Sequence, residues 1–215
     1  MAESPSRSGA HPAAAWCAVA LALALPALSL GWSPLDPARA DALHAALLWT
    51  RDTAWSQPWR CWAAAWVHGS APHLLGNLLG TVLVALLGLA ARVPPRAALA
   101  WALAWPLTQL GLFADARLPA YGGLSGVLHA GVAVAALHLL ARPASRVLGA
   151  AVLVGLLAKV AGEAPWQAAL WPSGALGIAV APLAHLSGVM SGLLCGVACG
   201  VACGLLRGVF RPTAD

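Results

Sequence analysis

Apolar residues run through most of the chain in long stretches that short polar segments interrupt. A membrane-spanning helix needs about 20 mainly apolar residues. Six stretches approach that length and predict spans over residues 13–31, 72–91, 97–114, 123–141, 147–163 and 181–206. Residues 166–180 are also apolar, but Pro172 and Gly174 interrupt them, so we expect a loop that dips into the membrane interface. The pattern predicts an all-α polytopic membrane protein.

Composition agrees with this interpretation. Of the 215 residues, 60% are apolar and 9% are charged, whereas a soluble domain carries about 25% charged residues. At this length we expect a single membrane domain over residues 1–215. The net charge of +5 does not indicate nucleic-acid binding, because the basic residues are dispersed beside apolar runs. The five cysteines lack metal-binding spacing, so we predict packing roles for them and neither a metal nor a cofactor.

Arginines beside the short connections predict the orientation, because short cytoplasmic loops are enriched in basic residues. Seven lie on the side of the chain ends and of the loops after the second and fourth spans: Arg7, Arg92, Arg96, Arg142, Arg146, Arg207 and Arg211. Five basic residues lie on the other side. We therefore expect both termini in the cytoplasm and a cytoplasmic tail over residues 1–12. The Ala-, Gly- and Arg-rich composition suggests a bacterial protein, and hence a location in the inner membrane.

The long outer segment over residues 32–71 is rich in tryptophan, a residue that concentrates at membrane interfaces. Five lie within eighteen residues: Trp49, Trp55, Trp59, Trp62 and Trp66. We expect a structured loop with interfacial helices. In an alternative interpretation, the first span is a signal peptide cleaved near Ala38-Arg39-Ala40. It is less favoured because the apolar run is long and ends well before that site.

Polar side chains occur near the starts of the second, fourth and sixth spans, where burial in lipid is costly and suggests function. They are His73 and Asn77 in the second span, Ser125 and His129 in the fourth and His185 in the sixth, with His68 just before the second. Singly, each has an ordinary explanation as a hydrogen-bonded packing residue. The predicted topology, however, places all three span starts at the same outer face, so the side chains can converge.

Glycines predict which spans are in contact. In the sixth span they recur every fourth residue, at Gly188, Gly192, Gly196, Gly200 and Gly204. Gly122 and Gly126 give the start of the fourth span a matching small face, and such faces let helix backbones approach closely. Packing of these two spans would bring His185 to Ser125. A simple packing seam or a homodimer face is the alternative.

Serine is a weak nucleophile and needs an adjacent base. His185 is the base that the predicted packing brings to Ser125. No acidic residue lies within a span at this depth, so we expect a Ser–His dyad rather than a triad.

Attack on an amide carbonyl creates an oxyanion, and each preorganised donor to it is worth about 2.7–4 kcal/mol. The side chains of His73 and Asn77 and the backbone N–H of Ser125 are the expected donors. Gly123 and Gly126 would let a substrate backbone approach the nucleophile.

Three motifs resemble those of the rhomboid intramembrane serine proteases. They are G-x-S-G over residues 123–126, H-x4-H-x3-N over residues 68–77, and A-H-x2-G-x3-G over residues 184–192. Trp59-Arg60 is similar to the W-R pair of the family's first outer loop. The resemblance implies a six-helix rhomboid-like bundle. It also implies a serine endopeptidase that cleaves transmembrane segments of other membrane proteins near the outer face.

The resemblance also implies the role of each residue. Ser125 would be the nucleophile and His185 the general base, with His73, Asn77 and Ser125 forming the oxyanion hole. Supporting positions would be His68, Gly123, Gly126, His129 and Gly188. Many family members have tyrosine where this chain has His129. The small size and the sequence GLSGVLHA are most similar to the rhombosortase subgroup, which implies substrates with a C-terminal Gly-Gly, an apolar helix and a basic tail.

Two other functions compete with this interpretation. One is an inactive rhomboid-like protein that binds membrane helices, against which the presence of both Ser125 and His185 argues. The other is a transporter, but transporters usually carry intramembrane acidic residues and internal repeats, and the sequence has neither. The expected partners are transmembrane substrates and the lipid bilayer, with no nucleic acid and no particular oligomeric state.

Overall fold

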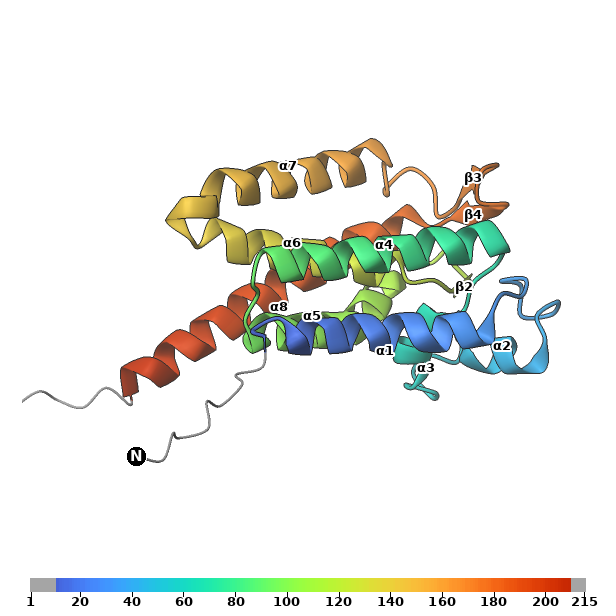
Figure 1. The fold of residues 1–215 in the computed structure, drawn as a ribbon. Helices are drawn as coiled ribbons and strands as arrows, with labels where there is room; N and C mark the ends of the chain where they lie inside the picture. Colours follow the sequence, from blue (N-terminus) through green and yellow to red (C-terminus); the bar gives the residue numbers. More distant parts are fainter. Residues whose placement is uncertain (1–10, 210–215) are drawn as a thin grey trace, which may run out of the picture.

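Six long helices form the body of the protein (Figure 1). The computed structural model describes residues 11–209, with side chains up to residue 203. The helices are α1 (Ala14–Leu30), α4 (Ala71–Ala90), α5 (Pro95–Leu110), α6 (Ser125–Leu140), α7 (Arg146–Gly162) and α8 (Pro182–Val209). They lie at the six predicted positions. Most of the predicted tail over residues 1–12, and the side chains of Arg7, Arg207 and Arg211, lie outside the described part.

Four stretches are long and apolar enough to cross a membrane. They are Ala71–Ala90, Pro95–Ala114, Pro143–Gly162 and Pro182–Cys203, whereas α1 and α6 are shorter apolar helices. Large apolar side chains are exposed along α4, α7 and α8, among them Leu75, Leu79, Leu83, Val147, Val154, Met190 and Leu194. A soluble protein would not expose such continuous apolar surfaces. The chain is thus mainly helical, and by length and composition four of its helices can cross a membrane.

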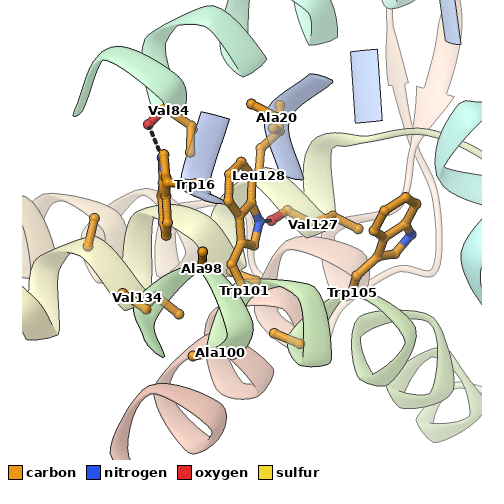
Figure 2. Packing of buried hydrophobic residues seen from close by; sticks show 14 of the residues in the cluster. Trp16, Ala20, Val84, Ala98, Ala100, Trp101, Trp105, Val127, Leu128 and Val134 are labelled. Atoms are coloured by element: carbon orange, nitrogen blue, oxygen red, sulfur yellow. Dashed lines mark hydrogen bonds between the residues drawn. The ribbon is translucent and has the colours of Figure 1, made fainter. Parts of the chain in front are cut away.

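Two tryptophans occupy the centre of the largest core cluster (Figure 2). Trp16 of α1 and Trp101 of α5 are fully buried, with ring centroids 4.3 Å apart. Their indole N–H groups donate to the carbonyls of Val84 at 2.9 Å and Val127 at 2.8 Å. The first predicted span is therefore an integral part of the helix packing, which argues against a cleaved signal peptide.

The segment between α1 and α4 folds into short elements. These are α2 (Ala42–Leu47), β1 (Trp49–Thr50), α3 (Arg60–Ala63) and the 3-10 turn η1 (Ala64–Trp66). The Asp41 carboxylate caps α2 by accepting from the backbone N–H groups of Leu43 and His44. The loop is structured, as expected, but its helices are only 6 and 4 residues long.

Arg60 of the Trp59-Arg60 pair holds this loop together. Its guanidinium is buried and donates to the carbonyl groups of Ala45, at 2.8 Å, and Leu48. Its Nε also donates to Gln57 Oε1 at 2.7 Å. Arg60 thus joins α3 to the end of α2.

Residues 166–180 differ from the loop that the sequence predicts. β3 (Trp171–Ser173) and β4 (Ile178–Val180) pair as an antiparallel hairpin, with Pro172 opposite Ala179. Gly177, at φ +63°, makes the turn with a backbone conformation that suits glycine. Pro172 and Gly174 do interrupt the apolar stretch, as predicted. The stretch nevertheless forms two paired strands and not an irregular loop.

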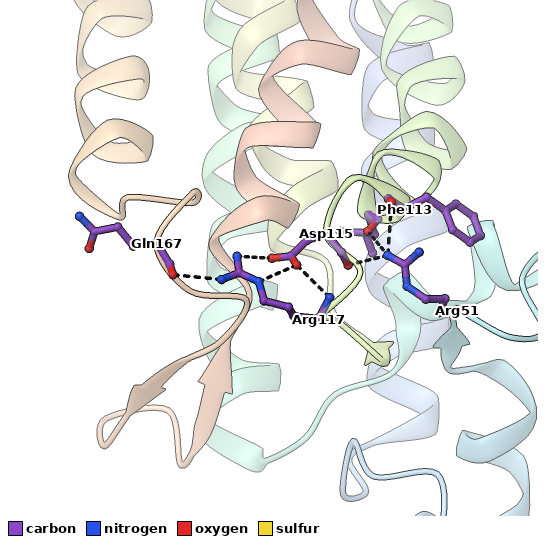
Figure 3. A network of polar contacts seen from close by, with 6 residues as sticks. Arg51, Phe113, Asp115, Arg117 and Gln167 are labelled. Carbon is purple, nitrogen blue, oxygen red and sulfur yellow. Dashed lines mark hydrogen bonds and ion pairs between the residues drawn. The ribbon is translucent and has the colours of Figure 1, made fainter.

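Polar contacts join the connecting segments at the end of the bundle that carries the hairpin (Figure 3). α5 continues as the 3-10 turn η2 (Gly111–Ala114), and β2 (Ala120–Tyr121) then pairs with β1. Arg51 donates to the Phe113 carbonyl at 3.3 Å. Arg117 pairs with Asp115 at 2.8 Å and donates to the Gln167 carbonyl at 3.2 Å. These contacts fix the segment after α7 against the loop before α6.

Candidate active site

Ser125 and His185 lie in hydrogen-bond contact across two helices. Ser125 is the first residue of α6, and His185 lies in the first turn of α8. The distance from Ser125 Oγ to His185 Nε2 is 2.9 Å, and the imidazole is buried. As the first residue of its helix, Ser125 has a backbone N–H with no partner one turn back. The predicted nucleophile, base and one predicted oxyanion donor therefore lie together.

Glycines allow this contact by bringing the backbones of α6 and α8 together. A Cβ added to Gly188 would overlap the Gly126 carbonyl, and one added to Gly192 would overlap the Ala130 carbonyl. A Cβ on Gly126 would lie 2.7 Å from the Ala184 carbonyl oxygen. The predicted small-residue contact is present.

The contact covers only part of the glycine stripe. Gly196 packs against the Leu137 side chain, whereas a Cβ added to Gly200 would meet nothing within 4 Å. Gly204 lies beyond the residues with described side chains. The stripe therefore serves the α6–α8 contact at the end that carries the site.

His73 and Asn77 of α4 face the nucleophile loop, residues 122–124 just before the predicted nucleophile Ser125. Gly123 has φ +135°, and a Cβ there would lie 2.9 Å from His73 Nε2 and 3.6 Å from Asn77 Nδ2. The Gly69 N–H donates to His73 Nδ1 at 3.3 Å, so Nε2 carries the ring proton and is a donor. Asn77 Nδ2 is buried without a partner among the described residues. His73 Nε2 and Asn77 Nδ2 are thus two N–H donors near Gly123, close enough to Ser125 to bind an oxyanion formed there.

His129 stacks on His185. The ring centroids are 4.2 Å apart and the planes are inclined by 14°. His129 Nδ1 donates to the Ser125 carbonyl at 2.6 Å, one turn back in α6. His129 therefore fixes the plane of the His185 ring and is itself held by the helix that carries Ser125.

His68 packs beside His73. Its ring is fully buried 4.9 Å from the His73 ring, and its Nδ1 donates to the Trp66 carbonyl at 3.1 Å. Burial lowers the pKa of His68 to about 3, so the ring is neutral at pH 7. This position allows the His68 ring to support the His73 ring.

Tyr121 is a site residue that the sequence analysis did not select. Its hydroxyl donates to the Gly123 carbonyl at 3.3 Å and lies 3.4 Å from Ser125 Oγ. Burial raises the pKa of the Tyr121 hydroxyl, so it stays protonated. A signal was present, because the only tyrosine of the chain lies two residues before the Gly123-Leu124-Ser125-Gly126 motif.

Glu163 corrects the expectation that no acidic residue reaches the depth of the site. Its Oε2 lies 2.6 Å from His185 Nδ1, on the ring edge opposite Ser125. Its Oε1 pairs with Lys159 Nζ at 2.6 Å, and this ammonium lies 3.4 Å from His185 Nδ1. Although burial raises its pKa, hydrogen bonds from His185 and Lys159 together lower the pKa of Glu163 to about 2, so it is ionised at pH 7.

The end of α7 explains why Glu163 was missed. Glu163 is the residue that caps α7, and the next residue, Ala164, has φ +45°, a left-handed conformation that ends the helix. The carboxylate therefore lies just beyond the last residue of α7, at the end of the predicted span, and reaches His185 of α8. The signal was the Lys159–Glu163 pair, four residues apart at the end of a short span.

A cavity of about 1010 Å³ gives access to these groups. Its lining includes His73, Asn77, Ser125, His129, Glu163 and His185. The loop around Leu35 and Asp36 and the turn of the β3–β4 hairpin at Gly177 complete its walls. The cavity is large enough for an extended peptide segment and for water, both of which hydrolysis requires.

No family model matches the chain, and no curated protein is similar enough to it to count as a match. Function is therefore inferred from the residues and geometry of the site.

Proposed function

We propose that this protein is an intramembrane serine endopeptidase of the rhomboid type, with six spans and both termini in the cytoplasm. The observation that carries this proposal is the 2.9 Å contact between Ser125 Oγ and His185 Nε2 inside a large cavity. A serine within a membrane helix usually bonds its own backbone. Here the hydroxyl is turned toward a base instead, which is the arrangement of an activated nucleophile.

In the first chemical step, Ser125 Oγ attacks the carbonyl carbon of the scissile amide and its proton passes to His185 Nε2. The C–N bond then breaks, and the same proton passes from Nε2 to the leaving amine. Water next attacks the acyl-enzyme, giving one proton to Nε2. Collapse of that second intermediate releases the carboxylic acid product and returns the proton to Ser125 Oγ.

The oxyanion of both intermediates would be held by three donors. His73 Nε2–H and Asn77 Nδ2–H face the nucleophile loop across Gly123, and the Ser125 backbone N–H completes the set. A buried donor without a partner is costly in the resting protein. An unpaired Asn77 amide in the cavity wall is therefore better explained by a bond that forms only during the reaction.

The substrate class follows from the surroundings of the site. The exposed apolar surfaces of α4, α7 and α8 favour a protein that meets its substrate in the bilayer, so we propose transmembrane segments of other proteins, cut near the outer face. Similarity to rhombosortases extends the proposal to substrates with a C-terminal Gly-Gly, an apolar helix and a basic tail. The proposed location is a bacterial inner membrane.

Labelling with a fluorescent fluorophosphonate tests the activated serine. The detergent-purified protein should be labelled, and Ser125→Ala and His185→Ala should lose the label while keeping their helix content. Ser29→Ala, which removes an exposed serine near the end of α1, is the matched control and should label normally.

Cleavage of a transmembrane peptide ending in a Gly-Gly, apolar and basic sequence tests the reaction itself. A cut made by the wild type and lost in both site variants supports the proposal. If a folded wild type neither labels nor cuts but still binds the peptide, the protein is a non-cleaving binder of membrane helices.

A further inference from the structure

The Nδ1 side of His185 contains a charged arrangement that a simple Ser–His dyad does not need. We propose that Glu163 is a positioning residue that holds His185 in the tautomer and orientation required of the base. The active site is then a Ser125–His185–Glu163 arrangement. This inference rests on the proposed serine endopeptidase function.

The tautomer of His185 decides whether it can act. To take the proton of Ser125, Nε2 must be an acceptor, so the neutral ring must carry its proton on Nδ1. Nδ1 faces two groups, Glu163 Oε2 at 2.6 Å and Lys159 Nζ at 3.4 Å. An ionised carboxylate only accepts and an ammonium only donates. The closer carboxylate therefore favours the productive tautomer, and the ammonium alone would favour the other.

The two oxygens of Glu163 have separate partners. Oε1 takes the Lys159 ammonium and Oε2 takes the imidazole. The Lys159 side chain is 48% exposed, whereas the His185 side chain is only 6% exposed. An ordinary ion pair at a helix end would leave the second oxygen in water. Here that oxygen is directed inward to the base, with Lys159 holding the other end of the carboxylate.

Charge gives Glu163 a second effect. When His185 takes the proton it becomes a cation, and the other titratable groups that face it are Lys159 from α7, His129 from α6 and His73 from α4. Among the residues with described side chains, Glu163 is the one carboxylate in contact with His185. It therefore supplies the negative charge that stabilises the imidazolium as the transition state forms.

Kinetics of Glu163→Gln provide the first test. We expect kcat to fall about 100-fold with KM little changed. Replacing the carboxylate of a soluble Ser–His–Asp enzyme by an amide lowers kcat by about 10⁴-fold. The loss should be smaller here because Glu163 is 28% exposed. Glu163→Asp should recover a large part of the activity. Asp52→Asn, which removes an exposed carboxylate outside the cavity, should behave like the wild type.

The pH profile separates this role from a structural one. Without the negative charge, the base gains its proton only at more acidic pH, so the acid limb of the kcat profile should move to lower pH in Glu163→Gln. Lys159→Met should move the same limb to higher pH. Wild-type kcat and an unmoved acid limb in a folded Glu163→Gln protein would overturn the proposal even if Ser125 and His185 prove essential.

A tautomer measurement on the wild type and two folded variants does not need cleavage. In protein labelled with [15N]histidine in micelles, the His185 signals, identified by their loss in His185→Ala, should show a protonated Nδ1 and an unprotonated Nε2 at pH 8. Glu163→Ala should raise the share of the Nε2–H form. An Nε2–H tautomer in the wild type would refute the role of Glu163. Because this result does not depend on turnover, it is independent of whether the endopeptidase proposal succeeds.

Discussion

The ring of His129 lies nearly parallel to the ring of His185, with centroids 4.2 Å apart. The bond from His129 Nδ1 to the Ser125 carbonyl fixes the stacking ring to the helix that carries the nucleophile. One side chain therefore connects Ser125 and His185, the proposed nucleophile and base. A second imidazole thus supplies the stacking contact on His185.

Replacing His129 should therefore slow turnover, because the His185 ring loses the stacking contact that fixes its plane. Aromatic pairs contribute about 0.5–1.5 kcal/mol beyond their buried area, so His129→Ala should lower kcat by about 2- to 10-fold. His129→Tyr should retain more activity, because a stacking ring is restored. Steady-state kinetics on a transmembrane peptide check this order. Equal losses in the two variants would show that the stacking contact has no part in the reaction.

Asn77→Ala should lower kcat with little change in KM. Its buried Nδ2 has no partner among the described residues, so its bond to the oxyanion would form only in the transition state. Removal of one such donor costs about 10²- to 10³-fold in kcat. Thr81→Val, one turn further along α4, is the control, because the Thr81 hydroxyl donates to the Asn77 backbone carbonyl and Thr81 does not line the cavity. A rise in KM at unchanged kcat would instead assign Asn77 to ground-state binding.

The positions of the six long helices could be predicted from the sequence, because apolar runs and helix-breaking residues mark them directly. The meeting of the starts of α4, α6 and α8 was predicted from the polar residues at those starts. Predicted span 72–91 is α4 at Ala71–Ala90, and predicted span 147–163 is α7 at Arg146–Gly162. The close approach at Gly126 and Gly188 followed from small residues at helical spacing.

Other features depend on the path of the chain outside these runs. The β3–β4 hairpin arises where apolar residues with a proline could equally form an irregular loop. Glu163 reaches His185 because Ala164 ends α7 in a left-handed conformation, which its residue type does not favour. Tyr121 reaches Gly123 because β2 pairs with β1, a contact between segments about seventy residues apart. None of these has a local sequence signal strong enough to decide it.

Glu163 should make stability depend on pH in the acid range. Its pKa of about 2 lies below the ordinary value of 4.5. The stabilisation from its ionised form is therefore complete above about pH 4.5 and lost as the pH falls toward 2. The free energy of unfolding in mixed micelles should differ more between wild type and Glu163→Gln at pH 7 than at pH 3. An equal difference at both pH values would contradict the lowered pKa.

The glycine contact between α6 and α8 gives a matched pair of substitutions. Gly188→Ala places a methyl group onto the Gly126 carbonyl, whereas Gly200→Ala places one where nothing lies within 4 Å. Overpacking typically costs about 1–3 kcal/mol, and relief of that overlap would move α8, and His185 with it, away from Ser125. Gly188→Ala should therefore lower both the unfolding midpoint and kcat.

Gly200→Ala should keep kcat and gain up to about 1 kcal/mol from the higher helix propensity of alanine. Thermal unfolding in micelles and peptide cleavage, measured on the same preparations, compare the two variants. If Gly188→Ala matched Gly200→Ala in both measurements, the backbone contact would not be what brings His185 to Ser125.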